Sequence, residues 1–466
     1  MSEQAKFLEG NLFGHITVMS LTASVGLMAV FMVDLIDMVF ISMLGKAELA
    51  AAVGYAGAIL FFTTSFGIGM AIAAGALVAR ALGAGDEELA RRRSSTAMIY
   101  GVVFGALFAA LVWWNVRPLA ALMGASGETL DLATGYLRII VPSLPVLLIG
   151  MVGSAILRAR GAARRAMMVT IVGGLVNLVL DPILIFGLNL ELTGAALASV
   201  AARFAIGGAA LYLIFKHYGG LASPDLPALR TDFSPILAIA FPAILTQLAT
   251  PIGQAYVTRS MAAYGEEAVA GMAIVARLTP VAFGVLFALS GAIGPIIGQN
   301  FGAGRHDRVR GAFRDGLIFT AVVVVLISAA LYALRWPIAT LFGVEEAGIA
   351  RDLVFLFCGP LALAFYFNGL IFVANAAYNN LGHPYYSTWI NWGRHTVGTI
   401  LPVVAFSAWL GADGVLIGQA VGGIAFGLVS WWLAAKVMTG QDPKSDPTGD
   451  PFSRQARLFQ LLHHRR

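Results

Sequence analysis

Charged residues are scarce in this sequence. Only 12% of its 466 residues are Asp, Glu, Lys or Arg, whereas 59% are hydrophobic and the mean hydropathy is +0.82. An ordinary soluble domain carries roughly 25% charged residues, so the composition excludes a water-soluble protein. The formal net charge of +5 comes from basic residues in short loops beside apolar runs. We interpret them as topology signals and expect no nucleic-acid partner.

Cysteine and the familiar catalytic motifs are also missing. The one cysteine, Cys358, lies in an apolar run, so a disulfide framework and a cysteine-based metal site are both excluded. The chain contains no Walker A, HExxH, GxSxG or CxxC sequence. We therefore predict that it is not an enzyme and needs no cofactor, and that an ion gradient supplies the energy for any work it does.

What the sequence does contain is a series of long apolar runs. About 20 apolar residues in a helix cross the roughly 30 Å of a membrane's hydrocarbon core. The first run is too long, and lacks a small-residue cleavage site, for a removable signal peptide. We predict an all-α integral membrane protein with twelve transmembrane helices at residues 15–43, 50–80, 94–115, 131–157, 165–187, 192–215, 235–259, 267–299, 314–335, 350–377, 386–409 and 412–437.

Lys and Arg are distributed unequally between alternate loops. One set of loops contains Arg80, Arg91, Arg92, Arg93, Arg158, Arg160, Arg164, Arg165, Lys216, Arg230, Arg305, Arg308, Arg310 and Arg314. The other set has only Lys46, Arg117, Arg259, Arg335 and Arg351. By the positive-inside rule, we expect a multi-pass protein of a bacterial inner (plasma) membrane with both termini cytoplasmic.

The two halves of the sequence repeat. Residues 118–124 (PLAALMG) match 337–343 (PIATLFG), the GAG at 83–85 matches that at 302–304, Leu44-Gly45 resembles Tyr264-Gly265, and Gly161 pairs with Gly382. Six helices separate equivalent points, so the halves share one topology and are related by an axis along the membrane normal. We predict an N-terminal lobe at 1–218, a cytoplasmic linker at 219–234, a C-terminal lobe at 235–437 and a cytoplasmic tail at 438–466.

Three acids lie within the predicted membrane helices of the first half. Asp34 and Asp37 are separated by one helical turn, and Asp181 follows Asn177 at i+4, directly before Pro182. An ionised carboxylate at the bilayer centre costs about 2.5–3.5 kcal/mol, so its presence points to function. We interpret the acids as a proton or sodium relay. The alternative is that they pair with Arg203 or lie near a water-exposed helix end.

Other polar and flexible side chains carry weaker signals. Met32 and Phe61 could belong to an adaptable apolar wall for varied ligands, although lipid-facing or packing roles are the commoner explanation. Gln247, Gln254 and Asn368 are uncharged polar residues within second-half helices. We take these five as candidate substrate-cavity residues.

The chain resembles the multidrug and toxic compound extrusion (MATE) family over about residues 10–437. The resemblance rests on DMVFISMLG at 37–45 followed by Leu49-Ala50-Ala51, on the two GAG turns, and on NLVLDP at 177–182. It implies a twelve-helix, two-lobe, V-shaped antiporter that expels organic, often cationic, small molecules in exchange for H⁺ or Na⁺. We expect a monomer whose partners are its substrate and membrane lipid.

The resemblance also implies an ion-coupling network in the first lobe, made of Asp37, Tyr136, Asn177, Asp181 and Ser199. Asp37, Asp181 and Asn177 would bind the metal ion if Na⁺ is the coupling ion. We add Asp34, an acid with no counterpart in the family network.

The chain departs from the family pattern at three further positions. Ser199 replaces the more usual threonine, and Thr22 replaces a proline that lets the first helix bend, whereas its repeat mate Pro242 keeps the proline. Asn368 replaces a second-lobe acid of sodium-coupled relatives. This weakens the case for a cation site in the second lobe and favours one in the first lobe.

Two other functions remain open at this point. A flippase for a lipid-linked precursor would need a strongly basic cavity, whereas the membrane interior offers only Arg203, Arg277 and Arg394. A membrane-embedded enzyme acting on lipids would need acids and histidines that face one cleft. The spacing of the seven histidines does not supply that arrangement.

Overall fold

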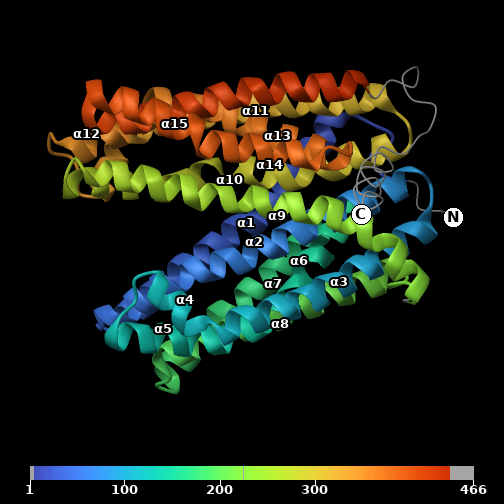
Figure 1. The fold of residues 1–466 in the computed structure, drawn as a ribbon, viewed down its shortest axis with the longest axis horizontal. Coiled ribbons are helices and arrows are strands. Elements are labelled where there is room, and N and C mark those ends of the chain that lie inside the picture. Colours follow the sequence, from blue (N-terminus) through green and yellow to red (C-terminus); the bar gives the residue numbers. More distant parts are fainter. Residues whose placement is uncertain (1–4, 224, 441–466) are drawn as a thin grey trace, which may run out of the picture. The chain divides into compact units, whose positions relative to one another are not determined.

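The computed structural model describes residues 5–223 and 225–440, which fold into helices joined by short turns (Figure 1). The helices are α1 (Leu12–Met43), α2 (Ala47–Gly83), α3 (Glu87–Trp114), α4 (Val116–Leu122), α5 (Gly127–Ile140), η1 (Val141–Ser143), α6 (Leu144–Ala159), α7 (Ala163–Pro182), η2 (Ile183–Gly187), α8 (Glu191–Tyr218), α9 (Leu226–Ala262), α10 (Glu266–Gly302), α11 (His306–Leu341), α12 (Ile349–Leu356), η3 (Phe357–Leu361), α13 (Ala362–Asn380), α14 (Pro384–His395) and α15 (Val397–Gly440).

The chain forms two compact units. Unit 1 holds the residues up to Lys6 and Val25–Ile244, and unit 2 holds Phe7–Ser24 and the residues from Leu245 onward. Helices α1 and α9 therefore each belong partly to one unit and partly to the other. The lobes predicted at 1–218 and 235–437 stay a prediction, and most of the predicted tail, residues 441–466, lies outside the described residues.

Helix α9 begins earlier than the sequence pattern indicated, inside the segment expected to be a linker. The Asp225 carboxylate accepts a hydrogen bond from the backbone N–H of Ala228 at 2.7 Å, which caps the first turn. Pro227 follows at the start of the helix, where a missing N–H costs nothing. The helix therefore starts at Leu226, nine residues before the first residue expected.

Eleven helical stretches of the described residues are long and apolar enough to cross a membrane, and the last, Pro384–Gly440, contains 57 residues. A straight helix of that length would measure about 85 Å, far more than the roughly 30 Å of hydrocarbon. Gly411 interrupts it with φ 62° and ψ −133°. Before and after Gly411 the chain runs as two helices, which confirms the predicted twelve.

The two parts of α15 pack against each other as a hairpin. A Cβ added to Gly414 would lie 2.1 Å from the Phe406 carbonyl oxygen, and one added to Gly422 would lie 1.6 Å from that of Gly398. As the chain advances from Gly414 to Gly422, its partner moves back from Phe406 to Gly398, so the two parts run antiparallel. Small residues permit this close backbone approach within a membrane.

Turn glycines preserve the internal repeat in the backbone. Gly45, Gly85, Gly124 and Gly161 all have left-handed φ angles, and so do Gly265, Gly304, Gly343 and Gly382. The members of each pair are about 220 residues apart, and a left-handed residue favours glycine because it lacks a Cβ. The sequence repeat is thus a repeat of chain turns at equivalent ends of helices.

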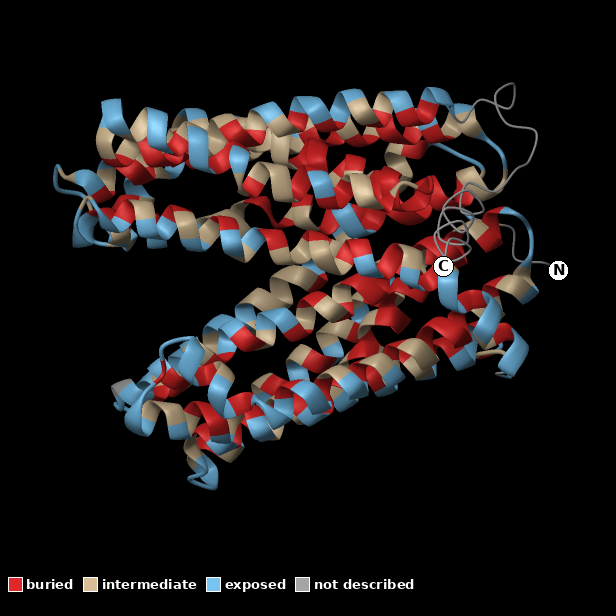
Figure 2. Cartoon of the chain, in the orientation of Figure 1, coloured by how far each residue is buried: buried red, intermediate tan, exposed pale blue. Residues whose placement is uncertain are grey.

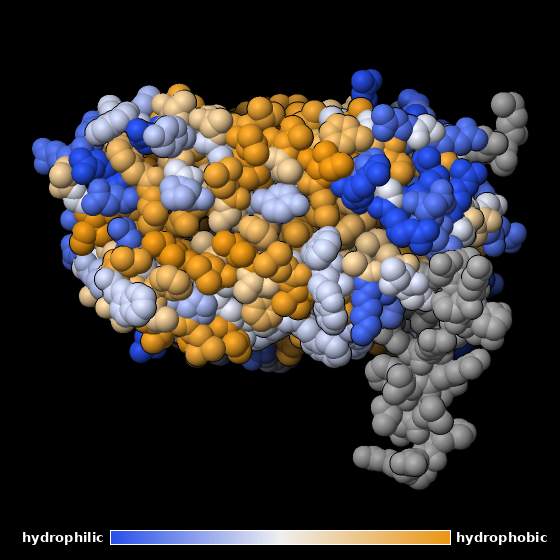
Figure 3. Space-filling view, turned by 90° about the horizontal axis from the view of Figure 1, so that it is seen from above, coloured by the Kyte–Doolittle hydropathy of each residue, from blue (hydrophilic) through white to orange (hydrophobic). Residues whose placement is uncertain are grey.

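Large apolar side chains cover the outside of the helices. Leu107 and Leu111 on α3 are each 62% exposed, and Trp409 on α15 is 86% exposed. Figure 2 shows the buried residues gathered along the helix faces that meet within each unit. On the face in Figure 3, hydrophobic side chains fill the middle and hydrophilic ones gather toward both ends. Such a surface suits lipid rather than water.

Candidate ion-coupling site

Helices α1 and α7 approach closely in unit 1 through small residues. A Cβ on Gly26 of α1 would contact the Met167 backbone at 3.6 Å, and one on Gly174 of α7 would lie 3.3 Å from the Val33 side chain. Helix α8 also packs on α7, where Gly173 of α7 leaves room for Ile206 of α8. Side chains of α1, α7 and α8 therefore meet at short range in the membrane interior.

Asn177 joins the two principal acids. Its side-chain amide donates to Asp181 Oδ2 at 2.6 Å, and it lies 3.2 and 3.3 Å from the two carboxyl oxygens of Asp37. Asn177 and Asp181 are on one face of α7 because they are four residues apart. Asp181 is 1% exposed and Asn177 6% exposed, whereas Asp37 is half-buried.

The two carboxyl groups also lie within hydrogen-bonding reach of each other. Two like charges this close repel strongly in a poorly solvated site, and a proton or small cation between them removes the repulsion. Asp181 Oδ1 is buried without a hydrogen-bond partner among the described residues. The cluster therefore offers an oxygen-lined position with an unused ligand atom.

Tyr136 and Ser199 extend this cluster toward α5 and α8. The Tyr136 side chain lies within hydrogen-bonding reach of Ser199 and close enough to Asp37 and Asp181 to interact with them electrostatically. Both residues are half-buried. The structure thus brings together all five residues that the family resemblance placed in the network.

Arg203 does not neutralise the acids. Its guanidinium donates to the Ile140 carbonyl and to Ser143 Oγ, both at 3.0 Å. These carbonyl and hydroxyl oxygens lie where α5 passes through η1 into α6. The alternative in which Asp37 and Asp181 form ion pairs with Arg203 is therefore wrong, because the arginine binds a backbone carbonyl and a hydroxyl group instead.

Asp34 lies outside the hydrogen-bonded cluster, although it is close enough to Asp37 to interact with it electrostatically. Its side chain is exposed, and it forms no hydrogen bond or ion pair with another described residue. A separation of three residues rotates a side chain by about 60° away from Asp37 around the helix, so the shared face predicted from the spacing does not bring both acids into contact with Asn177.

The ligand chemistry favours a proton or a hard cation. Within residues 5–223 and 225–440, no group of three or more His, Cys, Asp or Glu side chains could hold a metal ion. Asp37, Asn177 and Asp181 provide only carboxyl and amide oxygens as ligands, and oxygen ligands suit alkali and alkaline-earth ions.

The candidate substrate-cavity residues are divided between the two units. Met32 and Phe61 are 57% and 41% exposed in unit 1. In unit 2, the side chains of Gln254 and Gln419 are hydrogen-bonded at 3.4 Å, and Gln247 is half-buried. The Asn368 amide oxygen is buried without a partner in the described chain, beside Gly423.

Two other second-half amides have a structural role that the sequence did not reveal. Gln299 Oε1 accepts from the Phe7 backbone N–H at 2.9 Å, and Asn300 Nδ2 donates to the Phe7 carbonyl at 3.0 Å. Arg308 adds a hydrogen bond to the same carbonyl. These side chains hold a turn almost 300 residues away, which no local sequence signal could show.

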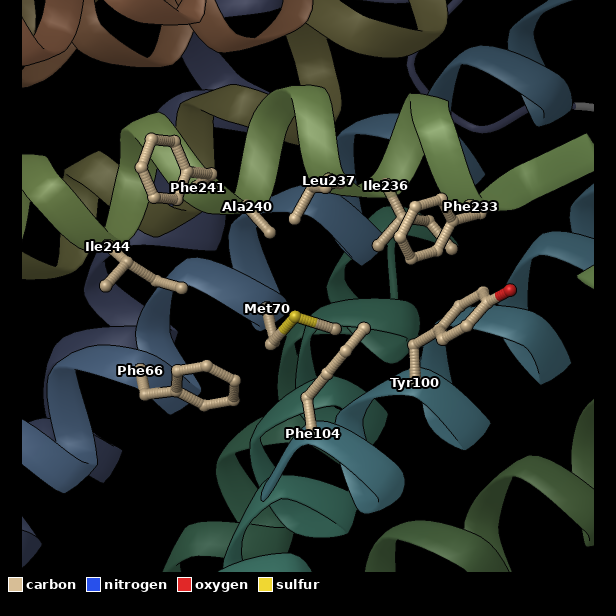
Figure 4. A pocket seen from close by; sticks show the side chains of 10 residues that line it. All are labelled: Phe66, Met70, Tyr100, Phe104, Phe233, Ile236, Leu237, Ala240, Phe241 and Ile244. Carbon is tan, nitrogen blue, oxygen red and sulfur yellow. The ribbon is translucent and has the colours of Figure 1, made fainter. Parts of the chain in front are cut away.

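An apolar pocket of about 120 Å³ lies elsewhere in unit 1 (Figure 4). Its lining comes from α2, α3 and the first part of α9: Phe66, Met70, Tyr100, Phe104, Phe233, Ile236, Leu237, Ala240, Phe241 and Ile244. None of these residues was selected from the sequence, because aromatic residues at helical spacing look like ordinary packing. The pocket could accept an apolar ring or a short hydrocarbon segment.

Twelve apolar helices in repeated halves, with an acid pair joined by one amide, are typical of a membrane transporter. The MatE family model matches residues 23–183 and 242–404, so the chain belongs to the MATE family of efflux transporters. The family resemblance and the fold class predicted from the sequence are thereby confirmed.

Known proteins resemble the chain over most of its length. A protein of Shewanella oneidensis described as "FAD transporter" is 30% identical and covers 90% of this chain and 93% of its own. The multidrug export protein MepA of Staphylococcus aureus is 26% identical over 70% of this chain and 73% of its own. A mutant of the Vibrio cholerae MATE transporter VcmN matches with a TM-score of 0.86 at 25% identity, covering 92% and 98%.

Proposed function

We propose that the chain exports small organic, often cationic, compounds across a bacterial plasma membrane in exchange for H⁺ or Na⁺, and that Asp37 and Asp181 bind the coupling ion. Tyr136, Asn177 and Ser199 position the two carboxyl groups. The observation that supports this proposal is the Asp37–Asn177–Asp181 cluster, in which two acids share one amide and one carboxyl oxygen has no partner.

The exchange follows from the chemistry of that cluster. An empty pair of carboxylates is unstable because the charges repel, so the site favours either an occupied state or a conformation in which water reaches it. A cation that binds one conformation better than the other shifts the population toward it by its difference in affinity. Release of the cation on the opposite side then resets the transporter.

Transport by the purified protein in proteoliposomes tests the proposal. Proton and sodium gradients are imposed separately, and uptake of ethidium, an organic cation, is compared for the parent, Asp37→Asn and Asp181→Asn. We expect one gradient to drive uptake by the parent, and both variants to lose gradient-driven uptake while they fold normally. Parental uptake by both variants would overturn the proposal.

An anionic flavin nucleotide is a second candidate substrate. The Shewanella relative is described as an FAD transporter. Along α10 after Glu267, and throughout α13 and α14, the described residues include Arg277 and Arg394 but no Asp or Glu. Arginines on helices without acids favour an anion over a cation. FAD is therefore included in the same transport assay, and uptake of FAD without ethidium would favour this substrate.

A further inference from the structure

A second cavity lies at one end of unit 1, beside the acid cluster. It has a volume of about 250 Å³ and is lined by residues of α5 and by the first turn of α8. The lining residues are Glu128, Asp131, Leu132, Gly135, Tyr136, Leu192 and Thr193. This is the end that carries the α1–α2 turn, because Lys46 of that turn binds Glu191 at the start of α8.

Tyr136 belongs both to this cavity and to the ion-coupling cluster. Its ring lines the cavity, and its side chain lies within reach of Ser199 and interacts with Asp37 and Asp181. Behind it, Asp181 Oδ1 is almost fully buried and has no partner among the described residues. An ion that binds Asp181 Oδ1 must pass from the surface into unit 1. The cavity reaches Tyr136, which lies near the acid pair.

The charges around the cavity favour cations. Lys46 is hydrogen-bonded to Glu191 at 2.8 Å, and this bond raises the pKa of the Lys46 ammonium. Arg117 pairs with Asp131. Glu128 forms no ion pair within the described chain, and Glu48 adds a further acid near Lys46. Glu128 and Asp131 line the cavity, and its lining contains no basic residue. Asp131 is paired with Arg117, so Glu128 leaves a net negative charge at the cavity.

We propose that this cavity is the entrance through which the coupling cation reaches Asp37 and Asp181, with Glu128 attracting the ion and Tyr136 standing between the cavity and the acid pair. The inference rests on the proposed function, since it requires a coupling cation. It assigns to Glu128 a role in ion access that is separate from ion binding, and it predicts that filling the cavity from Gly135 or Thr193 blocks the path of the ion.

Substitution of Gly135 can test whether ions pass through the cavity. A Cβ at this position would meet nothing within 4 Å, so a larger side chain fits without displacing the backbone and occupies the cavity. Thr193 offers the same possibility from α8, since its side chain is exposed on the opposite wall. Gly135→Leu and Thr193→Leu are therefore two independent ways to fill the cavity, and Gly135→Ala is a matched control.

Gradient-driven ethidium uptake is measured in proteoliposomes against the concentration of the coupling cation, with melting temperature and ethidium binding as controls for folding. We expect both leucine variants to slow uptake on the order of tenfold, Gly135→Ala to match the parent, and Glu128→Gln to raise the half-saturating cation concentration about threefold at low ionic strength. Glu128→Asp should restore the parental value.

Parental rates in both leucine variants, together with an unchanged cation dependence in Glu128→Gln, would overturn the proposal that the cavity is the entrance for the cation. If this occurs while Asp37→Asn still abolishes uptake, the coupling site stands and only its access route is wrong. Parental uptake by Asp37→Asn would instead overturn the proposed function itself.

Discussion

Asn177 determines the geometry of the site at the scale of single residues. It donates to one acid on its own helix and contacts another on α1. The i+4 spacing from Asn177 to Asp181 was visible in the sequence, but the contact with Asp37, 140 residues away, was implied only by the family resemblance. Hydrogen bonds from this amide hold both carboxyl groups near one another.

Replacing Asn177 by Leu should change ion binding without removing either acid. A buried carboxylate that loses its amide donor costs about 1–3 kcal/mol, so the apparent affinity should fall about fivefold or more if sodium is the coupling ion, and should rise by a similar factor if it is the proton, because protonation removes the unpaired charge. Transport rate against cation concentration in proteoliposomes measures this. An unchanged affinity in folded protein would show that the amide does not organise the site.

Asp34 provides the opposite prediction. Because its side chain is exposed and has no partner in the described chain, Asp34→Asn should keep at least about half of the parental transport rate, whereas Asp37→Asn, one turn away, should lose gradient-driven transport. Side-by-side assays of the two variants at equal membrane insertion give the comparison. Equal losses in both would place Asp34 in the coupling network after all.

At the scale of elements, the hairpin within α15 shows what the sequence could predict. The break between helices at 409 and 412 was predicted from the sequence, and Gly411 is where the backbone leaves helical geometry. The early start of α9 was missed because its cap, Asp225, follows Pro224 in a segment that looked like a linker. The length of an apolar run locates a membrane helix well. It does not show polar, capped turns that extend the helix beyond the run.

Gly422→Ala should destabilise this hairpin. The added Cβ would approach the Gly398 carbonyl oxygen to 1.6 Å, and relief of that overlap should cost about 1–3 kcal/mol or more. We expect a lower melting temperature and less monodisperse protein in detergent. Gly208→Ala is the control: nothing lies within 4 Å of its added Cβ, so it should be neutral or stabilise α8 by up to about 1 kcal/mol.

At the scale of the whole molecule, the two halves share their turn glycines but not their intramembrane acids. The four pairs of left-handed glycines recur about 220 residues apart, so the repeated fold could be read from the sequence. At the same offset, the acids Asp37 and Asp181 correspond to Val257 and Leu401. The second half thus keeps the helices while it lacks the acid pair, so the coupling site that we propose lies in the first half alone.

The orientation of the molecule stays a prediction from the distribution of basic residues, and it can be tested with thiol labelling. The native Cys358 is buried, so it should react little with a membrane-impermeant maleimide. In intact cells, Ser126→Cys should be labelled and Glu88→Cys should be labelled only after the membrane is opened, because the arginine-rich turns face the cytoplasm. The reverse pattern would invert the predicted topology.

The most direct test of the account asks whether substrate displaces an ion from the acid cluster. Purified protein in weakly buffered detergent is mixed with substrate, and released protons are followed with a pH indicator and released sodium with a radioactive tracer. We predict that the parent releases one of these ions on binding substrate, while Asp37→Asn and Asp181→Asn bind substrate and release none. Parental release from both variants would contradict a coupling site built from Asp37, Asn177 and Asp181.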